Sequence, residues 1–458
     1  MSTIAAISTA PAIGGIGIVR LSGDKCFEIL DKIFVQKNIE SIEEIDGYRI
    51  KYGKIVKPTS QKVIDEVLVS YFKAPKSYTT ENMCEINSHG GIVVLREILE
   101  ICLENGADLA EPGEFTKRAF INGRIDLAQA EAIIDIINAK TTREAQESAN
   151  QLEGFLSKKI NEIKTKIIDI MVDIEANIDY PEYDIEEVSN KIAEEKLNDV
   201  LQNLIKLSKS FENGKILKEG IKLAIIGSPN AGKSSLLNAI LKEDRAIVTD
   251  IAGTTRDIIE EQVVIEGIPF KIIDTAGIRN AENMIEQIGI EKSKKVAKES
   301  DVVLAVFDSS VNLSDEDREI LKLLKEKKSI IILNKMDLNQ KLLEDNKEFK
   351  ETERPIIKMS LKKEEGLDKL FEELVKMFNL NQINLDNELV ITNIRHQESI
   401  NKAIESTRKA LNDLNASMPI DIISINIKQI LEHLGEITGD NVSEDIIKSI
   451  FSKFCLGK

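Results

Sequence analysis

The spacing of hydrophobic positions changes several times along the chain, and each change predicts a different kind of structure. In the first 120 residues, short β-branched runs are separated by glycine and proline. GIGIVRLSG, DEVLVSYFKAP and MCEINSHGG predict strands, and IVVLREILEICLENGA predicts a helix. The opening MSTIAAISTAPAIGGIGIVRLSG lacks the basic start of a signal peptide and predicts strand, loop and strand. We therefore expect a small α/β domain over residues 1–120.

Helical spacing dominates two later stretches. From RIDLAQAEAI through SKKINEIKTKIIDIMVDIEANID, apolar residues recur every three or four positions, which predicts long helices. YPEYD interrupts this pattern, and a further helix is predicted from about Ser189 to Phe211. Helical spacing returns at about Leu380 and continues to the last residues. We expect one all-α domain formed by residues 121–217 and 380–458.

Residues 218–379 have a different pattern, in which apolar strands alternate with helices. This alternation is typical of a doubly wound parallel sheet. Because helical segments flank it on both sides, the simplest organisation is an α/β module inserted into the helical domain. The predicted fold class is therefore multidomain, with an N-terminal α/β domain, an all-α domain and an inserted α/β module.

Composition excludes several classes of protein. The 458 residues are 42% hydrophobic and 30% charged, as in globular proteins, and no apolar run approaches the length of a membrane span. A net charge of −17 argues against a protein that coats nucleic acid nonspecifically. The four cysteines and three histidines are scattered, which indicates a reducing compartment and gives no zinc signature. We expect a cytoplasmic protein without a membrane partner.

The segment GSPNAGKS, residues 227–234, matches the phosphate-binding motif G-x-x-x-x-G-K-[ST]. It follows the apolar run KLAIIG and precedes the helical pattern KSSLLNAIL, which is the context that the motif requires. Backbone N–H groups and the helix N-terminus bind phosphates, Lys233 contacts the outer phosphates, and Ser234 binds magnesium. The predicted residues of this loop are Asn230, Ala231, Gly232, Lys233, Ser234 and Ser235.

Two further motifs follow at the ends of predicted strands. FKIIDTAG supplies a carboxylate for the magnesium shell and a glycine N–H for the γ-phosphate, and SIIILNKMD supplies an aspartate that recognises guanine. The predicted residues are Asp274, Thr275, Ala276, Gly277, Asn334, Lys335 and Asp337. Three motifs in this order predict a Ras-like P-loop G domain that binds GTP rather than ATP. The supporting loop departs from the usual Ser-Ala, since it has Ser360-Leu361-Lys362.

Two residues bear on hydrolysis. Ile278 follows DTAG, where signalling GTPases have a glutamine that orients the attacking water, so another group must do this. Asn230 stands in the phosphate loop, where its amide oxygen could hold a monovalent cation against the phosphates. The alternative for Asn230 is a residue that only turns the loop.

The whole chain resembles the MnmE (TrmE) family of tRNA-uridine modification GTPases. The resemblance rests on GGIGIVRLSG, GEFTKRAFINGRIDLAQAEAI, GSPNAGKSSLLNAI, IVTDIAGTTRD and the C-terminal FCLGK. It implies a homodimer whose N-terminal domain binds a tetrahydrofolate derivative, in the 5,10-methylene or 5-formyl form. It also implies a partner, the flavoprotein MnmG, which uses FAD and NADH. Together they would place an aminomethyl or carboxymethylaminomethyl group on carbon 5 of the tRNA wobble uridine, with potassium joining the G domains and accelerating hydrolysis.

The resemblance also implies roles for particular residues. The potassium ligands would be Asn230, Thr249, Ile251 and Thr254, and the magnesium ligands Ser234 and Thr255. The nucleotide would further contact Thr249, Asp250, Ile251, Ala252, Gly253, Thr254 and Thr255. Glu286 in MIEQIGIEK would orient the water, although by itself it predicts only an exposed charge at a helix start. The folate would contact Arg20, Glu85 and Arg124.

The C-terminal FCLGK leaves three interpretations of Cys455. Gly457 and Lys458 are poor endings for a prenylation signal, and no polybasic run precedes it. A buried structural cysteine is the ordinary alternative. The resemblance implies that Cys455 acts near the folate and the modified uridine, as nucleophile or proton donor, and that Lys458 meets the charges of the cofactor.

Three other classes of GTPase remain as rivals. A ribosome-assembly GTPase would share the G domain and the apolar residue at position 278, but it should carry an RNA-binding module, and no KH-type GXXG or basic face is present. An iron–sulfur maturation GTPase would need clustered cysteines. A signalling switch is disfavoured by Ile278 and by the long flanking segments.

Overall fold

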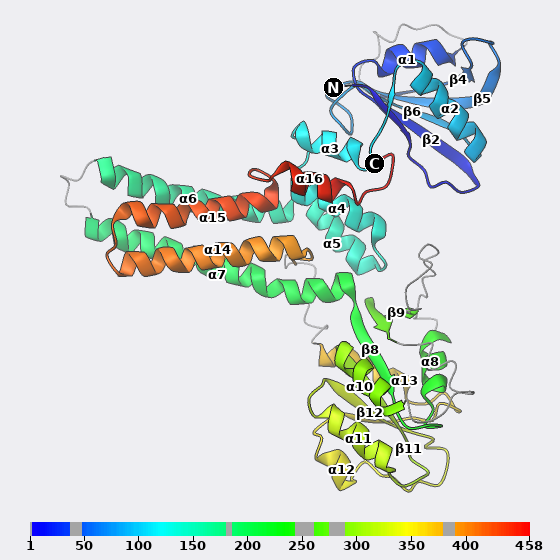
Figure 1. The fold of residues 1–458 in the computed structure, drawn as a ribbon, viewed down its shortest axis with the longest axis vertical. Coiled ribbons are helices and arrows are strands. Elements are labelled where there is room, and N and C mark those ends of the chain that lie inside the picture. Colours follow the sequence, from blue (N-terminus) through cyan, green and yellow to red (C-terminus); the bar gives the residue numbers. More distant parts are fainter. Residues whose placement is uncertain (1, 37–47, 180–185, 243–260, 274–288, 379–389) are drawn as a thin grey trace. The chain divides into compact units, whose positions relative to one another are not determined.

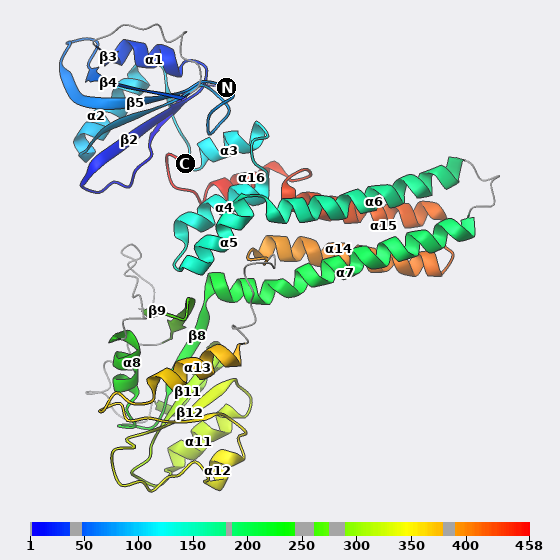
Figure 2. The same ribbon diagram turned by 180° about the vertical axis from the view of Figure 1, so that it is seen from behind.

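The computed structural model describes residues 2–36, 48–179, 186–242, 261–273, 289–378 and 390–458, which are drawn in colour in Figures 1 and 2. They divide into two compact units. The first consists of Met1–Ile134, Asn150–Ala193 and Lys409–Lys458, and the second of Asp135–Ala149 and Glu194–Arg408. The domain boundaries that the sequence predicts at residues 120, 217 and 379 stay predictions.

The first unit contains a seven-stranded sheet in the order β3-β4-β5-β6-β2-β1-β7. Its strands are β1 (Ile4–Ile7), β2 (Gly14–Ser22), β3 (Phe34–Val35), β4 (Tyr48–Val56), β5 (Val63–Phe72), β6 (Met83–Gly90) and β7 (Asp108–Leu109). Helices α1 (Cys26–Ile33) and α2 (Ile92–Glu104) cover one face of the sheet (Figure 1). The strands and the helix predicted for the first 120 residues are confirmed.

Alternation along the strands separates a buried face from a polar face. On β6, Cys84 and Ile86 point into the core beneath the helices, whereas Glu85 lies on the opposite face. Because β2 runs antiparallel to β6, Arg20 stands directly opposite Glu85. The sheet register therefore brings together two residues that are 65 positions apart in sequence.

The helical stretch that follows is broken by turns that the spacing pattern does not reveal. Its helices are α3 (Glu114–Ile121), α4 (Leu127–Asn138), α5 (Thr142–Leu152) and α6 (Phe155–Asp179). Gly154 has φ +87° and separates α5 from α6, since a left-handed residue ends a helix. Before α5, the Thr141 hydroxyl accepts the N–H of Glu144 at 3.0 Å and starts a new helix.

The remaining helices of the helical segments are α7 (Glu186–Glu219), α14 (Ile394–Asn415), α15 (Ile420–Thr438) and the short α16 (Glu444–Phe451). The predicted end of α7 at Phe211 is wrong, because the helix continues to Glu219 and ends before Gly220, whose φ is +79°. Helix α6 runs beside α15, and α7 runs beside α14 (Figures 1 and 2). Among the helices of the described residues, none is long and apolar enough to cross a membrane.

The second unit contains the α/β module, a six-stranded sheet in the order β13-β12-β11-β8-β10-β9. Its strands are β8 (Ile221–Ile226), β9 (Glu261–Ile265), β10 (Ile268–Ile272), β11 (Val302–Asp308), β12 (Ser329–Asn334) and β13 (Ile356–Lys358). Its helices are α8 (Lys233–Lys242), α10 (Gly289–Glu299), α11 (Asp315–Leu324), α12 (Lys347–Lys350) and α13 (Leu367–Met377).

The arrangement of this module confirms the predicted doubly wound fold. All neighbouring strands are parallel except the edge strand β9, which pairs antiparallel with β10. Helices α8 and α13 pack on one face, and α10 and α11 pack on the other. The carboxyl ends of β8 and β12 consequently lie at the same edge of the sheet, where ligands bind in such folds.

Candidate functional site

The phosphate-binding loop begins where β8 ends, and its shape depends on three backbone positions. A Cβ on Gly227 would lie 2.4 Å from the carbonyl oxygen of Val306, so only glycine fits there. Asn230 and Gly232 have φ angles of +60° and +112°, in the left-handed region. These turns bring the chain back over the N-terminus of α8, where the backbone N–H groups of the first turn favour an anion.

Lys233 lies across this loop. Its Nζ donates hydrogen bonds to the carbonyl oxygens of Gly227 at 2.9 Å and Ser228 at 2.8 Å. Burial lowers the pKa of Lys233, because the charged ammonium loses hydration while its two loop partners are only carbonyls. A phosphate is therefore the group that would best complete its environment.

Asn334 at the end of β12 connects the phosphate-binding loop with the predicted supporting loop, Ser360-Leu361-Lys362. Its Nδ2 donates to the carbonyl oxygen of Ala231 at 2.9 Å, and its Oδ1 accepts the N–H of Leu361 at 3.3 Å. A Cβ on Gly232 would lie 2.2 Å from the same Nδ2. Gly232 is therefore required for the loop to approach Asn334 closely.

The carboxylate that the sequence predicts to recognise guanine, Asp337, is also positioned by a neighbour. The Ser360 hydroxyl donates to Asp337 Oδ1 at 2.8 Å, and this hydrogen bond lowers the pKa of Asp337. Lys335, with φ +63°, forms an ion pair with Asp308 at 2.6 Å. Although Leu361 replaces the usual alanine after Ser360, its backbone N–H still meets Asn334, so the departure from Ser-Ala leaves the loop's hydrogen bonds in place.

Part of the predicted nucleotide site lies outside the described residues. This holds for Thr249, Asp250, Ile251, Ala252, Gly253, Thr254 and Thr255, for Asp274, Thr275, Ala276 and Gly277, and for Glu286. Asn230, Ser234 and Ser235 are described and exposed. The positive φ of Asn230 by itself accounts for an asparagine, since this residue tolerates left-handed backbone. Both interpretations of Asn230 therefore stay open.

A second candidate site lies on the polar face of the N-terminal sheet. Arg20 binds one oxygen of Glu85, Oε1, through Nε at 2.9 Å and through its terminal nitrogen at 2.8 Å. Another terminal nitrogen donates to the carbonyl oxygen of Gly457 at 3.1 Å, and the Ser8 hydroxyl donates to the same oxygen at 2.9 Å. The end of the chain is thereby held beside two predicted folate-binding residues.

Two aromatic residues that the sequence did not single out complete this site. The guanidinium carbon of Arg20 lies 5.6 Å from the ring centres of both Tyr78 and Phe115. Arg124 stacks on the same Tyr78 ring at 4.6 Å and donates to the Tyr78 carbonyl oxygen at 3.2 Å. Tyr78 thus connects Arg124 to Arg20. The only sequence signals were the aromatic residues in KSYTT and GEFTKRAF, and neither indicated which arginines it would meet.

The C-terminal tail adopts a conformation that depends on two glycines. Gly457 has φ +83°, and its Cβ would lie 2.3 Å from the carbonyl oxygen of Ile7. Gly113 has φ +69° and donates its N–H to the Cys455 carbonyl oxygen at 3.4 Å. Burial and the nearby Arg20 guanidinium lower the pKa of the Lys458 amine. The Lys458 side chain therefore belongs to the same site as Arg20.

Cys455 is exposed, whereas Cys26, Cys84 and Cys102 are buried. The alternative of a buried structural Cys455 is therefore wrong. Its backbone packs against Gly113 while the residue itself reaches solvent, because the neighbouring Phe454 takes the buried position. The site brings together Arg20, Glu85 and Lys458 directly, Arg124 through Tyr78, and Cys455 on the same docked tail.

Comparisons with known proteins agree over the full chain. The family models described as "GTP-binding protein TrmE N-terminus" and "MnmE helical domain" match residues 3–124 and 127–455. The chain is 48% identical over 461 residues to the tRNA modification GTPase MnmE of Acetivibrio thermocellus, and 49% identical over 457 residues to that of Clostridioides difficile. In both cases the alignment covers 100% of this chain and 99% of the relative. A solved G domain of the T. maritima FeoB iron transporter is 26% identical with a TM-score of 0.26, covering 34% of this chain and 98% of that chain.

Proposed function

Because the chain belongs to the MnmE family and is a GTP hydrolase of tRNA modification, we propose that its hydrolysis of GTP drives a folate-dependent modification of carbon 5 of the wobble uridine. The group added is aminomethyl or carboxymethylaminomethyl. The protein acts in the cytoplasm as a homodimer, together with the partner MnmG, which supplies FAD and NADH chemistry. The observation that carries this proposal is the docking of the C-terminal tail, with Cys455, against Arg20, which is itself paired with Glu85.

The G domain drives conformational change and does not itself contact the modified base. Ser234 and Thr255 would hold Mg²⁺, since hydroxyl oxygens are hard ligands that suit this ion. Potassium would be held by Asn230, Thr249, Ile251 and Thr254, and would bring two G domains together. The exposed side chain of Asn230 supports this role, because it is available to an ion at the edge of the phosphate-binding loop. Glu286 would orient the attacking water in place of the absent glutamine.

The residues around Arg20 fit a reduced folate. The two nitrogens of Arg20 that contact Glu85 both bind its Oε1. Among the described residues, Oε2 of Glu85 accepts no hydrogen bond, so this oxygen suits the N–H edge of a pterin. Arg124 and Lys458 are cations that suit the acidic tail of a folate. The aromatic ring of Tyr78 offers a flat apolar surface. When bound, the folate supplies the one-carbon unit, and the chain positions it and presents the Cys455 thiol.

The proposal is tested by mass spectrometry of tRNA nucleosides from source cells that lack this gene. We expect loss of the aminomethyl-type uridines and their return on complementation with the wild-type gene. Complementation with Cys455→Ser decides whether the thiol is needed. Unchanged nucleosides in the deletion strain would refute the proposal and favour the alternative of a ribosome-assembly GTPase.

The potassium role has a separate test on the purified protein. Hydrolysis should be faster in potassium chloride than in sodium chloride at equal ionic strength. The informative variant is Asn230→Gly, because glycine adopts a φ of +60° without an amide side chain. Loss of the potassium stimulation in this variant would assign the amide to the ion. Retention of the stimulation would mean that Asn230 only turns the loop.

The role of Glu286 can be examined in the same assay. Glu286→Ala should bind GTP like the wild type and lose most of its hydrolysis, since only the attacking water would lose its partner. Undiminished turnover would show that another group positions the water.

A further inference from the structure

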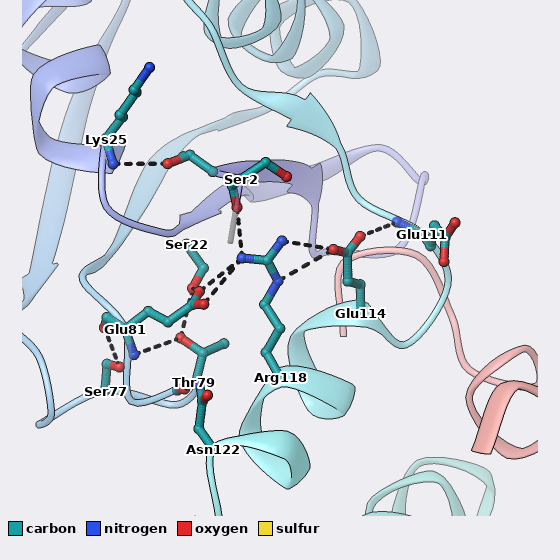
Figure 3. Close-up of polar contacts among 11 residues, drawn as sticks. Ser2, Ser22, Lys25, Ser77, Thr79, Glu81, Glu111, Glu114, Arg118 and Asn122 are labelled. Carbon is teal, nitrogen blue, oxygen red and sulfur yellow. Dashed lines mark hydrogen bonds and ion pairs between the residues drawn. The ribbon is translucent and has the colours of Figure 1, made fainter. Parts of the chain in front are cut away.

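Arg118 on α3 is a buried arginine that belongs to neither candidate site. Its side chain is 4% exposed. One terminal nitrogen donates to the Ser2 carbonyl oxygen at 2.8 Å and to Glu81 at 3.1 and 3.2 Å. The other donates to Glu114 Oε1 at 2.8 Å, which Nε also approaches at 3.3 Å. Figure 3 shows the guanidinium at the centre of these contacts.

The carboxylates around Arg118 are themselves held in place. Glu81 accepts a hydrogen bond from the Ser22 hydroxyl at 2.7 Å, and Glu114 accepts the N–H of Glu111 at 2.8 Å (Figure 3). A guanidinium joins several segments at fixed angles, whereas a lysine ammonium has no planar fork. The contacts therefore fix both the distances and the relative orientations of the three segments that meet at Arg118, which are the chain start, the loop of Glu81 and helix α3.

The three segments are the chain start, the loop of Glu81 and helix α3. Each contributes residues to the second candidate site, called here the Arg20 site, in which Arg20 contacts Glu85, two aromatic rings and the C-terminal tail. The chain start at Ser2 continues through β1 to Ser8, which binds the Gly457 carbonyl oxygen. The loop of Glu81 carries Tyr78, which stacks on Arg20 and Arg124.

Helix α3 is the third of these segments. It carries Phe115, which stacks on Arg20, and Thr116, whose hydroxyl lies 2.8 Å from that of Tyr78. Asn122, just beyond the helix, donates to the Thr79 carbonyl oxygen at 2.7 Å (Figure 3). The loop and the helix are thus joined on both sides of Arg118.

We propose that Arg118 is a positioning residue for the Arg20 site, acting through the chain start, the Glu81 loop and helix α3. It does not contact the ligand, because its side chain is almost fully buried and its nitrogens already donate to protein oxygens. Its removal lets the three segments move apart. Tyr78 and Phe115 then no longer flank Arg20, and the C-terminal tail loses the contacts that dock it. This inference rests on the proposed function only for the identity of the ligand.

The test uses the full chain with Arg118→Lys and Arg118→Met. Affinity for 5-formyltetrahydrofolate is measured by calorimetry, and unfolding temperature by scanning calorimetry. Iodoacetamide should react selectively with Cys455, because the other three cysteines are buried. The rate of this alkylation reports the docking of the tail that carries Cys455. The matched control is Ile98→Ala, which opens the core beneath α2 in the same unit without touching α3 or the Glu81 loop.

We expect Arg118→Lys to weaken folate binding by about 10- to 100-fold, because small misplacements of binding groups have effects of this size. It should also change the alkylation rate of Cys455 severalfold. Arg118→Met should have a larger effect on both the folate affinity and the alkylation rate. Ile98→Ala should lower the unfolding temperature at least as much while leaving both readouts near the wild type. If the arginine variants fold poorly, Glu114→Gln offers a milder change, because it weakens the ion pair with Arg118 without removing the arginine. It should shift both readouts in the same direction.

Two outcomes would overturn the proposal. One is an Arg118→Lys protein whose affinity and alkylation rate equal those of the wild type. The other is an equal loss in Ile98→Ala and Arg118→Lys at matched unfolding temperature, which would make Arg118 a residue of stability alone. A wild-type protein that binds no reduced folate would refute the folate part of the proposed function, and the alkylation rates would still decide the role of Arg118.

Discussion

Replacing Asn334 with alanine removes both contacts by which its side chain connects the phosphate-binding loop to the predicted supporting loop of Leu361. The side chain is buried, with the residue 3% exposed, so the groups that it leaves behind gain little water. The Ala231 carbonyl oxygen loses a hydrogen bond of 2.9 Å, and the Leu361 N–H loses a longer one of 3.3 Å. Ala231 is itself fully buried, which makes the first loss the more costly.

The magnitude follows from these geometries. A buried polar group without its partner costs about 1–3 kcal/mol, so the short hydrogen bond contributes most of a total of about 2–4 kcal/mol. If the two loops separate in the free protein, GTP must restore them, and the loss appears as weaker binding by about 30- to 900-fold. If they stay together, the loss appears in the free energy of unfolding instead.

The assay is equilibrium binding of a fluorescent GTP analogue, combined with thermal unfolding of the nucleotide-free protein. Asn334→Asp is the informative second variant, since it keeps an acceptor for Leu361 but places an oxygen against the Ala231 carbonyl oxygen. Asn401→Ala is the control, because Asn401 accepts its hydrogen bond from Ser208 in an exposed position of the same unit. Wild-type affinity together with wild-type unfolding temperature in Asn334→Ala would refute this reasoning.

Three further predictions concern single groups. Because the pKa of Lys458 is lowered, the unfolded chain keeps that proton to higher pH than the folded chain, so the stability that this group contributes rises from its folded pKa up to 10.5. The unfolding temperature of the wild type should therefore rise relative to that of Lys458→Met as the pH increases toward 10.5, and a constant difference would contradict this. Gly457→Ala should release the tail, because its Cβ would lie 2.3 Å from the Ile7 carbonyl oxygen; faster alkylation of Cys455 than in Leu456→Ala is the expected measurement. Asp337→Asn should lower GTP affinity by about a hundredfold through loss of charged hydrogen bonds and shift preference toward xanthosine triphosphate; unchanged selectivity would remove its role in base recognition.

Local sequence patterns were sufficient to identify the G domain and to place its motifs at strand ends, because these motifs are short. The loop of residues 227–234 lies between its own strand and helix, so its location and chemistry follow from neighbours in sequence. The NKMD motif could be placed at a strand end in the same way. The contact between Asn334 and Ala231 could not be predicted, since it depends on β8 and β12 ending at the same edge of the sheet.

Helix boundaries were predicted less well than helix positions. Apolar spacing continues across residues 139–141 and 153–154, so the pattern indicates one stretch where the chain forms three helices. The breaks depend on the Thr141 cap and on the left-handed backbone of Gly154, which are single-residue signals within a long periodic pattern. The end of α7 at Glu219, before the left-handed Gly220, was missed for the same reason.

The sequence by itself determined the fold class and the family to which the chain belongs, and it predicted the residues of the nucleotide loop, because each depends on contiguous residues. Only the tertiary structure decided how the Arg20 site is built. The β2–β6 register pairs Arg20 with Glu85, Tyr78 reaches it from a loop, and the last residues of the chain dock beside it. Arg118 was not predicted, because its partners come from the chain start, a loop and its own helix, and no sequence pattern encodes that convergence.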